Sequence, residues 1–255
     1  MNHLNDFITG LQFLSRIRLW PQKKWEEDGF GRSVKWFPLV GLCIGLGDIF
    51  VLWICSPYFS GLPLGVLLLL SHFFWAGAIC YDGLMDVADG VFSGRPREQM
   101  LEIMKDSRSG AFGVLAGAVA LLIRVIFLGN LPELMLVPVL LFTPVLSRWL
   151  MAGGVTLFPY ARKEGLGGMF SNYSSWGSFS FATLLMILIF LVGLMKFSPD
   201  ILMIISIIGI LSGLGVAFWL SAKLKGLTGD CYGAITESSE LIIFIVLVGL
   251  ASQGI

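Results

Sequence analysis

The chain has 255 residues, of which 56% are hydrophobic and 13% are charged, and its formal net charge is zero. A water-soluble domain carries roughly a quarter charged residues, so this composition excludes an ordinary soluble protein and indicates an integral membrane protein. Its four cysteines lack a Cys-x-x-Cys spacing, which argues against a zinc site or a disulfide framework. The zero net charge identifies no partner, and no nucleic-acid partner is expected.

Residues 3–18 form an amphipathic segment ahead of the long apolar runs. Leu4, Phe7, Leu11 and Leu14 fall on one stripe at helical spacing, which predicts a helix that lies in the membrane interface or packs against the bundle. The whole chain, 1–255, is expected to form one integral-membrane domain that begins with an amphipathic or interfacial segment, 1–33.

Apolar runs of about 20 residues, the length that crosses a bilayer as a helix, follow this segment. The expected fold class is therefore all-α: a polytopic bundle of about seven transmembrane helices plus the N-terminal amphipathic helix. The predicted spans are 34–55, 61–80, 110–128, 131–153, 179–197, 200–220 and 236–254.

The basic residues give this topology an orientation. All Lys and Arg residues except Lys196 and Arg124 fall on one side of the predicted bundle, and the positive-inside rule places that side in the cytoplasm. The connections on the opposite side are very short. The chemistry is therefore expected at the cytoplasmic helix ends and in three cytoplasmic active-site loops, 81–109, 154–178 and 221–239.

Three acidic residues follow the second apolar run. On a helix, Asp82, Asp86 and Asp89 lie at i, i+4 and i+7 and share one face. Clustered anions repel one another unless a cation lies among them, and carboxylate oxygens suit Mg²⁺ or Mn²⁺. The sequence thus predicts a metal site for phosphoryl transfer, with these three aspartates as ligands and catalytic residues. The alternative is a solvated acidic helix end.

Basic residues follow the acidic segment and are candidates for phosphate binding. Arg95 precedes a predicted helix start, where a phosphate can be held. Lys105, Asp106 and Arg108 come just before the third predicted span and offer two cations and a further carboxylate. Ordinary charge flanking a membrane helix is the competing interpretation for Arg95.

Two glycine-containing loops complete the predicted site. Arg162 and Glu164 precede the glycines at 165, 167 and 168, in a loop suited to phosphates or a large ligand. Thr228 and Asp230 lie in the later loop, followed by Glu237. This later group is predicted to complete the metal shell or to position a hydroxyl.

Five polar residues within or near the spans have less certain assignments. Asp48 and Arg124 are expected to pair with each other or to reach outward, and His72 is interpreted as a helix-contact residue rather than a catalyst. Arg148 is expected to point at the ligand cavity beside the Arg162 loop or to extend to the membrane interface. Glu240 is placed at the interface.

The order of the motifs resembles the cobalamin synthase family, the adenosylcobinamide-GDP ribazoletransferases of bacterial vitamin B12 assembly. The resemblance covers nearly the whole chain. It rests on residues 11–17 (LQFLSRI), 37–41 (FPLVG), 82–90 (DGLMDVADG), 103–108 (IMKDSR), 164–167 (EGLG), 228–230 (TGD), 233–234 (GA) and 237. Cys80 and Tyr81 depart from the more polar lead-in expected before Asp82.

This resemblance implies a Mg²⁺-dependent enzyme of the bacterial cytoplasmic (inner) membrane. Its substrates would be adenosylcobinamide-GDP and α-ribazole or α-ribazole 5′-phosphate, with GMP released; membrane lipid surrounds it, and oligomerisation stays open. The residues then suggest Arg95, Lys105, Arg108 and Arg162 as phosphate clamps, and Asp106, Asp230 or Glu237 as a further ligand or proton acceptor. Glu164, Thr228 and Glu237 are assigned to substrate binding.

Two other functions compete with this hypothesis. A CDP-alcohol phosphatidyltransferase also places several aspartates at membrane helix ends, but its later aspartate spacing is missing after Asp89-Gly90. A transporter is the non-enzyme alternative. It would more often place its key charges near the middle of the bilayer, whereas the acids here cluster at one face.

Overall fold

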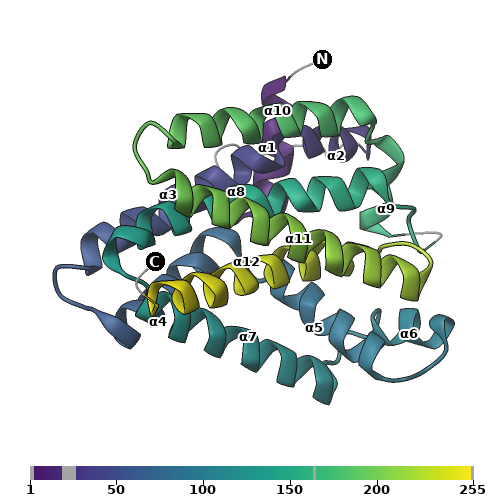
Figure 1. Ribbon diagram of the computed structural model, residues 1–255. Helices are drawn as coiled ribbons and strands as arrows, with labels where there is room; N and C mark the ends of the chain where they lie inside the picture. The colour runs from purple at the N-terminus through teal and green to yellow at the C-terminus, as the bar shows by residue number, and fades with distance from the viewer. Residues whose placement is uncertain (1–2, 19–26, 163–164, 254–255) are drawn as a thin grey trace.

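The computed structural model describes residues 3–18, 27–162 and 165–253, and this part of the chain is helical (Figure 1). Within it, Tyr160 and Leu227 pair in an isolated β-bridge. The predicted all-α class is confirmed. In chain order the helices are α1 (His3–Leu14), α2 (Glu27–Ser33), the 3-10 helix η1 (Val34–Trp36), α3 (Phe37–Cys55), α4 (Gly61–Ala76), α5 (Ile79–Phe92), α6 (Arg97–Ile103), α7 (Ala111–Asn130), α8 (Glu133–Leu157), α9 (Leu166–Tyr173), α10 (Trp176–Gly193), α11 (Pro199–Leu224) and α12 (Gly229–Ala251).

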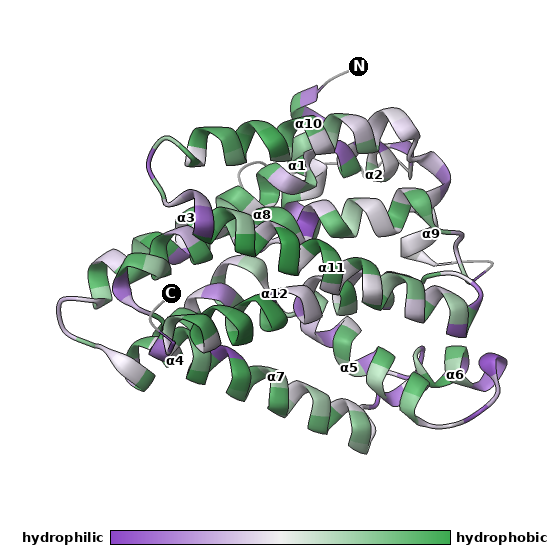
Figure 2. Ribbon diagram, in the orientation of Figure 1, coloured by the Kyte–Doolittle hydropathy of each residue, from purple (hydrophilic) through white to green (hydrophobic). Residues whose placement is uncertain are grey.

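The described helices also confirm a polytopic membrane protein. Six of them are long and apolar enough to cross a bilayer, and α4 with α5 makes a seventh if that bent pair counts as one span. The outward faces of α7, α10 and α11 carry exposed apolar side chains, which suits contact with lipid (Figure 2). Helix α8 is at the centre: 72% of its most apolar segment is buried, against 11% for α10.

The second predicted span, 61–80, is wrong as a continuous helix. Helix α4 ends at Ala76, Gly77 takes a φ of 74°, and α5 then runs at 98° to α4. A positive φ suits glycine and ends a helix. The carbonyl of Trp75 at this break accepts a hydrogen bond from the backbone N–H of Arg16, at 2.7 Å. The acidic segment therefore lies on a separate short helix.

The segments expected to be loops contain further helices. Residues 81–109 include most of α5 and all of α6, residues 154–178 include α9, and residues 221–239 include the start of α12. The last helix begins at Gly229, earlier than the predicted 236, because the Thr228 hydroxyl caps it by accepting a hydrogen bond from the Cys231 N–H. Residues 254 and 255 lie outside the described part of the chain.

Close contact between helices depends on glycine at the centre of the bundle. A Cβ atom on Gly41 of α3 would lie 2.2 Å from the carbonyl oxygen of Pro144 on α8. One on Gly45 would lie 2.5 Å from the carbonyl oxygen of Leu140. Small residues that let backbones approach are typical of membrane helix pairs. The α3–α8 pair forms the centre of the bundle, and α4, α10, α11 and α12 pack against it.

Helix α1 packs against the bundle, which decides between the two alternatives for the N-terminal segment. Its Asp6 is 1% exposed and pairs with Lys35 Nζ at 2.7 Å and with Arg32 Nε at 3.0 Å. A buried carboxylate needs such partners. The two ion pairs therefore fix α1 to α2 and η1.

Polar connections gather at one end of the bundle, at the right of Figure 1 beside α6 and α9. Arg97, at the start of α6, links two of these segments to its own. Its Nε donates to the carbonyl of Leu224 at 2.6 Å, and its Nη2 donates to the carbonyl of Ala161 at 2.8 Å. The N–H of Ala161 in turn donates to the carbonyl of Leu227, at 2.8 Å. Chain segments that are far apart in sequence therefore meet around Arg97 of α6.

Candidate functional site

Glycines bring α5 against the start of α12. A Cβ atom on Gly83 would lie 2.7 Å from the carbonyl oxygen of Asp230, and one on Gly233 would lie 2.8 Å from that of Cys80. Neither position has room for a side chain while the backbones stay where they are. This contact sets Asp82, on α5, beside Asp230.

Replacement of Gly233 by alanine tests this contact. We expect Gly233→Ala to lower the free energy of unfolding by about 1–3 kcal/mol, because the added methyl group overpacks a backbone–backbone contact. Gly249→Ala is the matched control, since it adds the same group on α12 where no atom lies within 4 Å. Thermal unfolding in detergent measures both; equal midpoints for the two variants would contradict the tight α5–α12 contact.

Three carboxylates and one guanidinium form the charged part of the site. Asp82 is exposed, whereas Asp86 and Asp230 are partly buried. Arg162 Nη2 lies 2.8 Å from Asp230 Oδ2, and Asp86 is within electrostatic reach of Asp82, Asp230 and Arg162. Arg162 offsets only part of the negative charge, so the group favours an additional cation.

Asp89, the third acid of the segment, has a different environment. It is 8% exposed, and its two carboxylate oxygens accept hydrogen bonds from the backbone N–H groups of Gly110 at 2.6 Å and Gly113 at 2.7 Å. It therefore caps the first turn of α7. The three aspartates do not converge on one point, and within residues 3–18, 27–162 and 165–253 no group of three or more His, Cys, Asp or Glu side chains is arranged to hold a metal ion.

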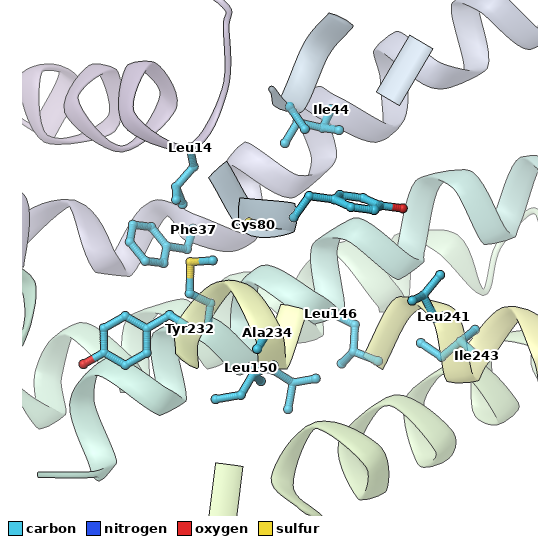
Figure 3. Packing of buried hydrophobic residues seen from close by; sticks show 14 of the residues in the cluster. Leu14, Phe37, Ile44, Cys80, Leu146, Leu150, Tyr232, Ala234, Leu241 and Ile243 are labelled. Carbon is cyan, nitrogen blue, oxygen red and sulfur yellow. The ribbon is translucent and has the colours of Figure 1, made fainter. Parts of the chain in front are cut away.

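A cavity of about 270 Å³ adjoins the charged group. Asp82, Arg162 and Asp230 line its polar side. Tyr160 lines it as well, and burial raises the pKa of this phenol, so the hydroxyl stays neutral and can donate a hydrogen bond. Figure 3 shows other lining residues, Leu14, Phe37, Cys80 and Tyr232, near one another in the core. The Cys80 position, where the sequence departs from the family pattern, is thus part of the cavity wall.

Four residues predicted for the site lie on the exposed surface between α5 and α7 and do not line the cavity: Arg95, Lys105, Asp106 and Arg108. Arg108 bonds to Asp106 through Nε at 3.0 Å and through Nη2 at 2.7 Å. Hydrogen bonds from the side chain and backbone of Arg108 lower the pKa of Asp106 to about 2. Asp106 is therefore a poor proton acceptor.

The remaining predicted residues divide into three cases. Thr228 is fully buried and caps α12, while its hydroxyl also donates to Asp230 Oδ2 at 3.2 Å. Glu237 is buried away from the cavity lining and pairs with Arg124 at 3.0 Å. Glu164 lies outside the described residues. Of the residues predicted in the later loop, Asp230 is the one that reaches the cavity.

A buried ionic cluster joins α7, α8 and α12. Arg124 Nη2 lies 2.7 Å from Glu240 Oε2, and the other oxygen of Glu240 accepts hydrogen bonds from Ser147, at 2.7 Å, and from Arg148. Both arginines and both glutamates, Glu237 and Glu240, are at most 2% exposed. The prediction that Glu240 lies at the interface is therefore wrong, and Arg148 points into this cluster instead of the cavity.

Asp48 belongs to a neighbouring set of polar contacts. Its carboxylate accepts a hydrogen bond from Ser71 at 2.6 Å and lies 3.0 Å from His72 Nδ1. His72 Nε2 lies 4.0 Å from Glu240, which links the two sets. Asp48 and Arg124 do not pair with each other. The earlier interpretation of His72 as a helix-contact residue agrees with this position.

Together, the fold and the site define a polytopic membrane protein with a cavity whose lining combines acidic residues with an apolar wall. The family whose sequence model is described as Cobalamin-5-phosphate synthase matches residues 6–248, and the chain belongs to this family.

Similar proteins agree with this assignment. A protein of Desulfitobacterium hafniense (strain Y51), named Adenosylcobinamide-GDP ribazoletransferase, is 40% identical over 251 residues, which cover 96% of this chain and 97% of that one. Two proteins of the same name, from Brevibacillus brevis and Clostridium novyi (strain NT), are 36% and 34% identical. They align with 96% and 99% of this chain, and with 98% and 100% of their own lengths. No solved structure gave a significant match.

Proposed function

We propose that the protein joins adenosylcobinamide-GDP to α-ribazole, or to α-ribazole 5′-phosphate, and releases GMP. The observation that carries this proposal is the group formed by Asp82, Asp86, Asp230 and Arg162 beside a largely apolar cavity. Such a group suits a reaction between a diphosphate, held at the charged side chains, and a nucleoside with an aromatic base. The names of the relatives support the same reaction.

The charged group also fits Mg²⁺, with Mn²⁺ as the alternative ion. Magnesium is usually held by one or two carboxylates together with substrate phosphates, so a cage of three protein side chains is not required. Asp82 would provide such a carboxylate, and Asp86 and Asp230 add negative charge nearby. When bound, the ion would neutralise charge on the diphosphate and its leaving oxygen. Asp89 takes no part in this proposal because both of its oxygens cap α7.

The side chains of this chain have distinct tasks in the transfer. The ribazole 3′-hydroxyl attacks the phosphorus on the cobinamide side; an O–P bond forms there, and the bond to the oxygen carried away by GMP breaks. Arg162 holds a phosphate oxygen in place of its present partner Asp230. Asp230 then accepts the hydroxyl proton. Asp106 and Glu237, the other acids considered for this task, are paired outside the cavity lining.

We also propose that the end of the bundle that carries Asp82, Asp86 and Asp230 faces the cytoplasm in a bacterial inner membrane. Arg97, at the start of α6, bonds to the carbonyls of Ala161, before α9, and of Leu224, at the end of α11, so cation-rich segments meet at this end. The positive-inside rule favours the cytoplasm for such segments. This orientation would give water-soluble substrates access from the side where they are made.

An assay of the purified protein in detergent tests the proposed function. We expect GMP to appear only when adenosylcobinamide-GDP, α-ribazole and Mg²⁺ are all present, with one joined product formed for each GMP. A detergent solution has no sealed compartment, so product formation there also separates an enzyme from a transporter. CMP released from CDP-diacylglycerol and an alcohol, without GMP release in the first mixture, would instead show phosphatidyltransferase activity and overturn the proposal.

A further inference from the structure

The cavity beside the acidic group has two chemically different ends. Asp82, Arg162 and Asp230 form one group of lining residues, called here the polar end, and three phenylalanines contributed by separate helices, Phe13, Phe37 and Phe170, form a second group, called the apolar or phenylalanine end (Leu14, Met151 and Val155 complete the apolar wall). Phe37 and Phe170 are 1% and 3% exposed, so their rings belong to the core and their positions are fixed by packing. Because both groups line the same cavity, one bound molecule can contact both.

The phenylalanines form a single aromatic cluster. The ring centroids of Phe13 and Phe170 are 4.7 Å apart, and those of Phe37 and Phe170 are 5.8 Å apart. Phe30 packs behind them, with its centroid 5.1 Å from that of Phe170, and does not line the cavity. Rings in such tilted and edge-on arrangements favour a further aromatic ring beside them.

The chemistry of this end selects among the aromatic parts of the proposed substrates. Guanine has several hydrogen-bonding groups on its edge, and these would be left without partners against phenylalanine, leucine, methionine and valine side chains. The base of α-ribazole is a dimethylated benzimidazole, which is flat and has one free ring nitrogen. Burial of its methyl groups and ring faces costs no hydrogen bonds. The corrin macrocycle is far too large for a cavity of about 270 Å³.

We infer that the apolar end, lined by Phe13, Phe37 and Phe170, binds the benzimidazole base of α-ribazole. This inference rests on the proposed function, which it deepens by assigning one substrate to one part of the site. With the base at the phenylalanine end, the attached ribose extends toward Asp82 and Asp230, where its hydroxyl must react. The same three residues then determine which bases the enzyme accepts.

Substitution of the lining phenylalanines tests the inference. We expect Phe13→Leu and Phe170→Leu to raise KM for α-ribazole roughly 3- to 10-fold, the loss typical of removing one aromatic contact, while KM for adenosylcobinamide-GDP stays unchanged. Both variants should also discriminate less strongly between α-ribazole and a nucleoside that carries adenine. Phe30→Leu is the matched control, because it removes a ring from the same cluster without changing the cavity lining.

Two further measurements separate a failure of this inference from a failure of the proposed function or of folding. Titration calorimetry of α-ribazole with each variant reports binding without turnover, and weaker binding in the two lining variants would support the site even if no GMP were formed. The thermal midpoint in detergent shows whether each variant folds. A rise in KM for adenosylcobinamide-GDP alone, or unchanged α-ribazole binding in folded lining variants, would overturn the inference.

Discussion

Asp82→Asn and Asp230→Asn are each expected to reduce kcat by roughly 100-fold or more, because each removes a carboxylate that lines the reacting end of the cavity. The neutral amide is nearly the same size as the carboxylate, so the fold should be retained. In Asp82→Asn, the Mg²⁺ concentration for half-maximal activity should also rise. Steady-state rates of GMP release, measured over a range of Mg²⁺ concentrations, provide both quantities.

The control for these variants is Asp200→Asn. Asp200 is an exposed acid in the first turn of α11, outside the cavity lining, and its substitution removes the same charge. Its kcat should equal that of the parent protein. Turnover close to that of the parent in both cavity variants would remove Asp82 and Asp230 from the catalytic site.

The second large effect is expected from Glu240→Gln, which should lower the free energy of unfolding by about 3–5 kcal/mol. Glu240 is fully buried and faces Arg124, Arg148 and Ser147, so the substitution leaves two buried guanidinium groups with too little negative charge. Uncompensated charge within a membrane protein is especially costly. Denaturation in mixed micelles, followed by helical circular dichroism, measures the loss.

Glu133→Gln gives the matching comparison. Glu133 is an exposed residue in the first turn of α8, so removal of its charge should change stability by less than about 0.5 kcal/mol. If Glu240→Gln were as stable as this control, the cluster would not be contributing to the fold.

The sequence was sufficient for the all-α, polytopic class, because membrane-spanning helices are recognised by their length and hydropathy. It also placed Asp82, Asp86 and Asp89 on one helix, since the spacing of four and three residues is local. The break after α4 was missed, although Gly77 marks it, because the apolar run continues through residue 80. The bend requires a partner from elsewhere, the N–H of Arg16, which no local pattern reveals.

The pairing of distant charges could not be predicted from the sequence. Glu240 follows Glu237 by three residues, a spacing equally typical of an exposed helix face, and only the position of α7 shows that both meet Arg124. Asp89 resembled its neighbours on α5, yet its partners are backbone groups at the start of α7. Gly110, at the N-cap of α7, has no side chain with which to cap this helix, and that leaves its first amides open to an acid from another helix.

The cap formed by Asp89 joins α5 to the first turn of α7. Its carboxylate holds two amide groups of α7, and three residues farther back Asp86 belongs to the charged group of the site. A shift of α5 along its axis would therefore break these two hydrogen bonds unless the first turn of α7 moved with it. Hydrogen exchange at the amides of Gly110 and Gly113, followed with and without substrate, measures how firmly this contact joins the two helices.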